Sequence, residues 1–183
     1  MSTKQYTSQN DLLLTNLKKF YENNSYLNKM ISIINGESRI SLRIVDWFVT
    51  NYAKKNFTVY ETNEGDRFKV YNDYKLKLKA YSKKRFDPFC RWERISFPYN
   101  ETSYIETTIG QLNFFKWCIE NDIIKYIESN YESIEKDMNS RNSTSKKQPD
   151  SDQTKTRKKR EELSVSACKC IKKENVKIMV TFN

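Results

Sequence analysis

Apolar residues recur every three or four positions along the first third of the chain, which is the spacing of helices with one buried face. Asp11 can cap the first helix and Ser38 or Ser41 the third, while Asn35 and Gly36 predict a left-handed end for the second. The apolar positions are Leu13, Leu17, Phe20 and Tyr21, then Leu27, Met30, Ile31 and Ile34, and then Leu42, Val45, Phe48, Val49 and Tyr52. We therefore expect three helices before residue 56.

Two pairs of short aromatic and β-branched stretches predict β-hairpins. The residues between the paired stretches include Asn, Gly, Asp and Pro, which are typical of turns. The first pair is 57–62 with 67–71 around a turn at 63–66, and the second is 94–97 with 103–107 around residues 98–101.

The segment between the hairpins, residues 74–86, fits either a strand or a helix. Its lysines alternate as in a strand, whereas its tyrosine and leucine residues keep a helical spacing. Asn72 or Asp73 can cap a helix here, and Pro88 ends one. We therefore expect a basic helix.

The clearest helix spans residues 108–127. Thr108 and Gln111 match a capping box, in which each side chain bonds the backbone amide of the other. A wide apolar arc follows, which predicts burial on much of the circumference. The arc consists of Ile109, Leu112, Phe114, Phe115, Trp117, Ile119, Ile123, Ile124 and Ile127. Beyond Ser129 and Asn130 we expect a more acidic extension to about Met138.

The last 45 residues differ from the rest of the chain. Residues 139–162 are polar and basic, which predicts a disordered linker. Alternating apolar residues at 163–167 and 176–182 then predict a C-terminal β-hairpin connected by 172–175. A lone hairpin is marginal in water, so its apolar face needs a partner. We expect it to dock on another protein or a second copy of this chain rather than on its own domain.

Together these patterns predict an α+β fold. It consists of a mainly helical domain at residues 8–138 with two short β-hairpins, a basic disordered linker at 139–162 and a C-terminal β-hairpin at 163–183.

The residues that the chain lacks exclude most familiar catalytic sites. Without histidine there is no imidazole base, no Ser-His or Cys-His pair and no His-containing zinc site. The three glycines are isolated, so Gly-rich phosphate loops are missing as well. We expect a protein that is not an enzyme and uses no cofactor.

The cysteines and carboxylates give weak signals for metal. Of Cys90, Cys118, Cys168 and Cys170, only the last two are closely spaced, so free thiols in a reducing compartment are favoured over zinc. Asp66, Asp73 and Lys75 loosely resemble a metal-dependent nuclease, which is a distant third hypothesis. The carboxylates Glu128, Glu132 and Glu135 share a helix face that we expect to be solvated. We predict no metal site.

The net charge of +10 is unevenly distributed. Residues 67–94 carry ten basic and three acidic groups, residues 101–138 carry three and eight, and residues 139–183 carry twelve and five. The lysine excess is partly what an AT-rich genome imposes, so the position of the charge is more informative than its sum. Both basic regions are candidates for binding nucleic acid.

The first basic region, residues 67–99, has two interpretations. Its cations and aromatic rings suit phosphates and unstacked bases. In the favoured alternative, the aromatic residues are core and the cations face the acidic helix at 120–137. In the second region, residues 155–160, function is favoured over a merely solvated linker, either as a phosphate contact or for nuclear import. The predicted nucleic-acid-binding residues are Lys75, Lys77, Lys79, Lys83, Lys84, Arg85, Arg91 and Arg94, followed by Lys155, Arg157, Lys158, Lys159 and Arg160.

Four blocks of sequence resemble a family of uncharacterised proteins from large nucleocytoplasmic DNA viruses, the mimivirus and chlorella-virus relatives. These blocks are SLRIVDWFVTNYAKKN at 41–56, YKLKLKAYSKKRFDPFCRWERI at 74–95, TTIGQLNFFKWCIENDIIKYIE at 107–128 and KKREELSVSA at 158–167. The resemblance implies a virus-encoded protein, either carried in the virion or present in the host-cell cytoplasm. It provides no functional residues.

No apolar run approaches the roughly 20 residues of a membrane helix, and the N-terminus has no signal-peptide core, so we expect an intracellular protein without membrane contact. The function that we expect is non-specific binding of nucleic acid or association with the virion. The alternative is a protein-interaction or assembly subunit whose basic regions serve solubility.

Overall fold

The computed structural model describes residues 9–63, 65–99, 103–144 and 173–175, which form a mainly helical α+β domain with two short antiparallel hairpins. The predicted helices of the first third are present. They are α1 (Gln9–Tyr21), α2 (Asn24–Asn35) and α3 (Leu42–Trp47). Gly36 ends α2 in the left-handed conformation, at φ 75°, and the Ser41 side chain caps α3 by accepting from the amide of Ile44.

The third helix does not continue as a regular α-helix. It passes into a π-helical turn, η1 (Phe48–Tyr52), and then into α4 (Ala53–Lys55). The hydroxyl of Thr50 donates to the carbonyl oxygen of Asp46 at 2.6 Å, a side-chain bond that competes with the regular ladder. The apolar spacing alone does not reveal this local change.

Both predicted hairpins form. In the first, β1 (Val59–Glu61) pairs with β2 (Arg67–Lys69), and the strands are shorter than expected. In the second, β3 (Arg94–Pro98) pairs with β4 (Ser103–Thr108), and the buried residues Phe97 and Ile105 lie opposite each other.

The basic segment is a helix, α5 (Val70–Arg85), as expected, but the expected cap is wrong. The helix already begins at Val70, and the carboxylate of Asp73 accepts a hydrogen bond from the indole of Trp117 at 2.6 Å. Near the other end, Ser82 has φ 60° and ψ 167°, so the last residues turn away from the helix axis.

The predicted core helix is two helices, α6 (Ile109–Glu120) and α7 (Ile123–Ser129). Asp122, at φ 54°, breaks it, and its carboxylate accepts from both the backbone and side-chain nitrogens of Asn63, at 3.0 and 2.6 Å. The hydroxyl of Tyr60 donates to the carbonyl oxygen of Asn121 at 2.6 Å. Residues of the first hairpin thus form hydrogen bonds with the carbonyl oxygen of Asn121 and the carboxylate of Asp122 at the break between α6 and α7.

Of the two hydrogen bonds predicted for the capping box at the start of α6, only one is formed. The Thr108 side chain accepts from the amide of Gln111 at 3.1 Å. The Gln111 side chain instead accepts from the hydroxyl of Thr107 at 2.8 Å and donates to the carbonyl oxygen of Pro88 at 2.9 Å.

The acidic extension, α8 (Tyr131–Thr144), runs six residues into the expected linker, which is a correction to its predicted start at 139. The added turns are held by Arg141, which lies 3.7 Å from Asp137 and stacks over the Trp47 ring. The rest of the expected linker, residues 145–162, lies outside the described residues.

The C-terminal region also differs from expectation. Residues 173–175, expected to connect two strands, are themselves a strand, β5 (Lys173–Asn175). This strand pairs antiparallel with β4 of its own domain, Ser103 opposite Asn175, because β4 otherwise leaves backbone groups free along that edge. The described strand therefore packs within its own chain, contrary to the docking that we favoured. The expected strands 163–167 and 176–182 lie outside the described residues, so contact with a partner through them stays a prediction.

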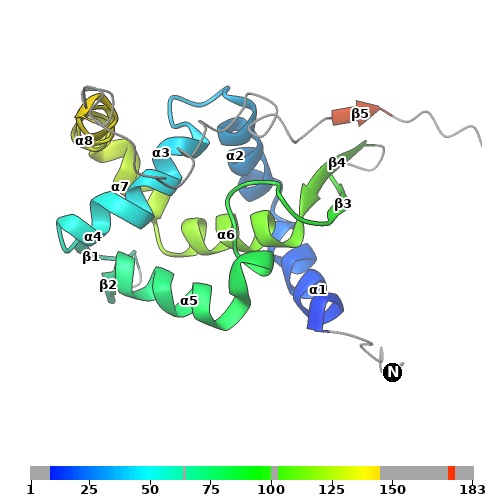
Figure 1. Cartoon of the computed structure of the whole chain (residues 1–183). Helices are drawn as coiled ribbons and strands as arrows, with labels where there is room; N and C mark the ends of the chain where they lie inside the picture. Colours follow the sequence, from blue (N-terminus) through cyan, green and yellow to red (C-terminus); the bar gives the residue numbers. More distant parts are fainter. Residues whose placement is uncertain (1–8, 64, 100–102, 145–172, 176–183) are drawn as a thin grey trace, which may run out of the picture.

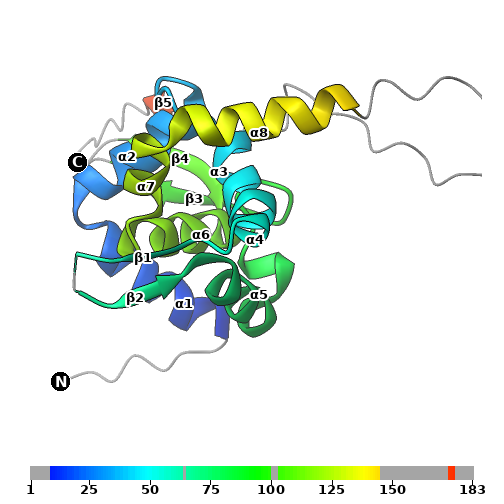
Figure 2. The same cartoon turned by 90° about the vertical axis from the view of Figure 1, so that its left-hand side faces the viewer.

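Helix α6 is the centre of the core. Figure 1 shows it crossing the middle of the molecule between α5 on one side and α2 and α3 on the other, and Figure 2 shows α1 beside it. Leu112, Phe114 and Phe115 on α6 are fully buried. The hydroxyl of Tyr21 donates to the carbonyl oxygen of Leu112 at 2.8 Å and joins α1 to this helix. None of the described helices combines the length and the apolar composition that a membrane span requires.

Candidate nucleic-acid interface

Helix α5 presents lysines to solvent. Lys75 and Lys79 are exposed and one turn apart, which separates them by about 6 Å along the axis. Lys83 and Lys84 are exposed after the irregular residue Ser82. Among the described residues, no carboxylate forms an ion pair with these four lysines or with the half-buried Lys77. We call these five residues the α5 lysines.

The three predicted arginines of this region are engaged elsewhere. Arg91 forms a two-point ion pair with the buried Asp87, with both distances 2.8 Å, and this hydrogen bonding raises the pKa of Arg91. Arg94 pairs with Glu106 at 2.9 Å. Arg85 donates from Nε to the side chain of Asn10 at 2.7 Å, and also contacts Gln9. These arginines contact other side chains of the fold, so among the predicted residues of this region the α5 lysines are those without an ion-pair partner in the described part of the chain.

The expected pairing of these cations with the acidic helix at 120–137 is wrong. The carboxylates of α7 and α8 face other elements, because the break at Asp122 turns this part of the chain away from α5. Their partners lie on α2, on α4 and in the loop before α3. The pairs are Glu128 with Lys29 at 3.6 Å, Glu132 with Arg39 at 3.9 Å and Asp137 with Lys55 at 3.0 Å.

The aromatic residues of the same region are mostly core, as the favoured interpretation held. Phe86 and Phe89 are buried, and Tyr74 and Tyr81 are half-buried against Phe86. Trp92 is the exception, at 43% exposure, and it lines a hollow of about 250 Å³ with Lys84 and Arg85. The exposed face of α5 thus offers charge rather than stacking surfaces.

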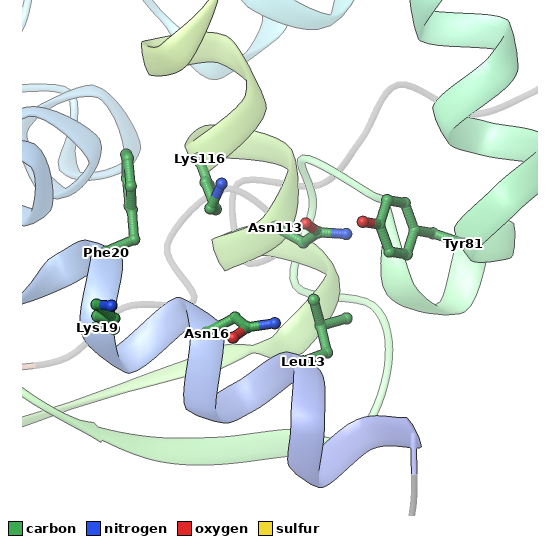
Figure 3. A pocket seen from close by; sticks show the side chains of 7 residues that line it. All are labelled: Leu13, Asn16, Lys19, Phe20, Tyr81, Asn113 and Lys116. Atoms are coloured by element: carbon green, nitrogen blue, oxygen red, sulfur yellow. The ribbon is translucent and has the colours of Figure 1, made fainter.

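A larger groove of about 470 Å³ lies where α1, α5 and α6 meet. Figure 3 shows the Tyr81 hydroxyl pointing across it toward Asn113, with Leu13 and Asn16 of α1 below. The groove is lined by Leu13, Asn16, Lys19, Phe20, Tyr81, Asn113 and Lys116. We did not predict it, and no local signal identifies it, since its residues are spread over more than 100 positions.

The end of α5 beside this groove is held tightly by α6. Asn113 donates from its side-chain nitrogen to the carbonyl oxygen of Arg85 at 2.9 Å, and the amide of Asp87 donates to the carbonyl oxygen of Gly110 at 3.2 Å. The backbone of Ser82 lies in a region that is nearly restricted to glycine and costs about 1–3 kcal/mol. Tight contacts with α6 thus hold a strained turn at the edge of the groove.

The other residues considered as candidate sites are cysteines and carboxylates. Cys90 and Cys118 are buried, and burial raises the pKa of Cys118, while Cys168 and Cys170 lie outside the described residues. Asp66 is exposed in the first turn. Within the described ranges, no group of three or more cysteine or carboxylate side chains is arranged to hold a metal ion.

The predicted residues of the second basic region are not described by the structure. These are Lys155, Arg157, Lys158, Lys159 and Arg160. Their contact with nucleic acid stays a prediction.

Comparison with known proteins places the chain among viral relatives. It is 44% identical over 146 residues to Uncharacterized protein L507 of Acanthamoeba polyphaga mimivirus, a match that covers 75% of this chain and 56% of the relative. The chain thus spans little more than half the length of that relative, and the similarity confirms the resemblance to giant-virus proteins. No solved structure shows significant similarity to this chain. Residues 1–155 match the model of DUF7197, and the chain therefore belongs to this family of unknown function.

Proposed function

We propose that this protein is a non-catalytic nucleic-acid-binding protein that contacts phosphates through the α5 lysines. The observation that carries the proposal is the exposure of Lys75, Lys79, Lys83 and Lys84 on one element, with no ion-pair partner among the described residues. An unpaired cluster of cations attracts a polyanion and releases its counterions on binding.

The same helix supports binding without sequence preference. Phosphate contacts position a protein on nucleic acid, whereas base contacts specify a sequence. Tyr74 and Tyr81 pack against the buried Phe86, and the centre of the Tyr71 ring lies 5.8 Å from the ammonium group of Lys75, so the exposed face of α5 offers mainly charge. Leu76, at 65% exposure, is its one large apolar side chain.

The experiment is a titration of a labelled random-sequence duplex with the full-length protein at several salt concentrations. Each phosphate contact contributes about 0.9 to the slope of log K against log salt. Replacing Lys75, Lys79 and Lys83 with alanine should therefore reduce the slope by up to about 2.7. The matched control replaces Lys18, Arg43 and Lys136, which are exposed and carry the same charge.

Each outcome has a definite meaning. A loss confined to the α5 variant supports the proposal. An equal loss in both variants shows that net charge, not α5, determines binding. If the unmodified protein does not bind even at low salt, the proposed function is wrong and the assembly-subunit alternative is favoured.

A further inference from the structure

The groove between α1, α5 and α6 has the lining of a site for a flat, mostly uncharged and polar-edged molecule. Asn16 and Asn113 contribute carboxamides, which both donate and accept hydrogen bonds. Phe20, Tyr81 and Leu13 contribute apolar and aromatic surface. The volume of about 470 Å³ lies within the range of small-molecule sites.

The charges at the groove are limited. Lys116 is ion-paired with Glu120, and its ammonium group also lies 5.0 Å from the centre of the Phe20 ring. Lys19 is exposed at the rim and has no ion-pair partner among the described residues. A single available cation does not favour a highly charged ligand such as an acidic peptide. One cation instead matches a ligand in which each planar group is accompanied by one phosphate.

Two side-chain carboxamides at the groove are available for hydrogen bonds with the planar group of such a ligand. Asn113 uses its side-chain nitrogen to hold the carbonyl oxygen of Arg85, and its side-chain oxygen accepts no hydrogen bond from the described residues. Asn16 is exposed and its side chain has no hydrogen bond within the described part of the chain. Together they present an acceptor on α6 and a rotatable donor and acceptor on α1.

Tyr81, the α5 residue that lines the groove, lies beside the end of α5 that carries Lys83 and Lys84. Tyr81 lies one turn after Lys77 on the same side of α5, and the strained residue Ser82 and the exposed Lys83 follow it directly. A strand whose phosphates contact Lys83 and Lys84 would have a nucleotide beside the groove. Strained backbone of this kind is concentrated at ligand-binding sites.

We infer that the groove receives an unstacked base of a single-stranded nucleic acid, an inference that rests on the proposed function. In a duplex the bases are stacked and paired inside the helix, so they cannot enter a groove of this kind. The groove therefore adds affinity for single strands to the charge attraction that single strands and duplexes share.

The experiment compares Asn16→Leu with the unmodified protein. The change keeps the charge and the approximate shape of the side chain but removes the hydrogen-bonding carboxamide from the groove. The melting temperature should be unchanged because Asn16 is exposed. The hydrogen bonds of one carboxamide contribute about two- to tenfold in affinity, so we expect a loss within this range for a labelled mixed-sequence 12-mer. Binding of the corresponding duplex should not change. Asn139→Leu, an exposed asparagine on α8, is the matched control.

The outcomes separate this inference from the proposed function. If both forms of nucleic acid bind and Asn16→Leu weakens neither, or weakens both equally, the inference is wrong and the proposed function stands. If neither binds, both are wrong. If a mononucleotide competes as well as the 12-mer, the groove takes free nucleotides and not strands. If polyglutamate of similar length competes as well as the 12-mer, the site recognises anionic chains, which also overturns the inference.

Discussion

Lys84 and Gly110 approach so closely that a methyl group on Gly110 would lie 3.0 Å from the carbonyl oxygen of Lys84. This contact joins the end of α5 to the first turn of α6. It fixes the position of the strained turn, and therefore of Tyr81 and Lys83, relative to the core.

Gly110→Ala should lower the free energy of unfolding by about 1–3 kcal/mol, because the neighbouring atom belongs to the backbone and cannot rotate away. At an uncrowded helical position the same change would raise stability by about 1 kcal/mol. Urea denaturation measures the difference, and a gain in stability would show that the contact is not tight.

Ser82→Gly should stabilise the protein by about 1 kcal/mol. Glycine relieves the strain of φ 60° and ψ 167°, although it also increases the entropy of the unfolded chain. The control is Ser140→Gly in the regular helix α8, which should destabilise by a similar amount. Thermal melting of the two variants checks the opposite signs, and a loss for both would contradict the strain at Ser82.

Asp137 should contribute stability that depends on pH. Burial by itself raises its pKa, but hydrogen bonds from Lys55 and Trp47 outweigh this effect and lower it below 3.8. A carboxyl group whose folded pKa is lowered stabilises the fold above its unfolded pKa and loses that effect as the pH falls through the folded value. Asp137→Asn should therefore cost about 1–3 kcal/mol at pH 7, and the difference from the unmodified protein should shrink below about pH 4.

Denaturation curves between pH 2 and 7 measure this dependence. Glu132→Gln serves as the control, because its carboxylate is 91% exposed and lies 3.9 Å from Arg39, so it should change stability little. A constant difference for Asp137→Asn across the range would show that its charge does not matter.

Leu76→Lys should strengthen binding to nucleic acid. Leu76 is exposed beside Lys79, so a cation there adds to the same face and should steepen the salt slope by about 0.9. Leu12→Lys adds the same charge at an exposed position on α1 and is the control. Equal gains in the two variants would mean that the added charge acts through the whole molecule.

Replacing Arg157, Lys158, Lys159 and Arg160 with alanine should flatten the salt slope by up to about 3.6, since four potential phosphate contacts are removed. Titration of a random-sequence duplex measures the change. If the slope is the same as for the unmodified protein, the second basic region does not contact the nucleic acid.

Much of the local structure could be predicted because its causes lie within a few residues. Gly36 ends α2, the hydroxyl of Ser41 starts α3, and Thr108 starts α6, each through a contact with a residue at most four positions away. A helix at α5 is expected because Asn72 or Asp73 can cap one; the helix forms, but it begins at Val70 and that cap is wrong. The sequence also indicated that the aromatic residues of the basic region belong mostly to the core.

The remaining features depend on residues that are far apart in sequence. Asn63 and Asp122 are 59 positions apart, and their hydrogen bonds break the helix that the apolar spacing predicts as continuous. The same break directs the acidic residues away from α5 and leaves its lysines unpaired among the described residues.

By itself the sequence determined the periodicities, the caps, the two hairpins and the uneven distribution of charge. The tertiary structure decided where the long helix breaks, which strand pairs with β4 and which cations remain available, and it assembled the groove from α1, α5 and α6. The physical reason is that spacing and capping act over one or two turns. Charge pairing and groove formation depend instead on which distant elements the packed core brings together.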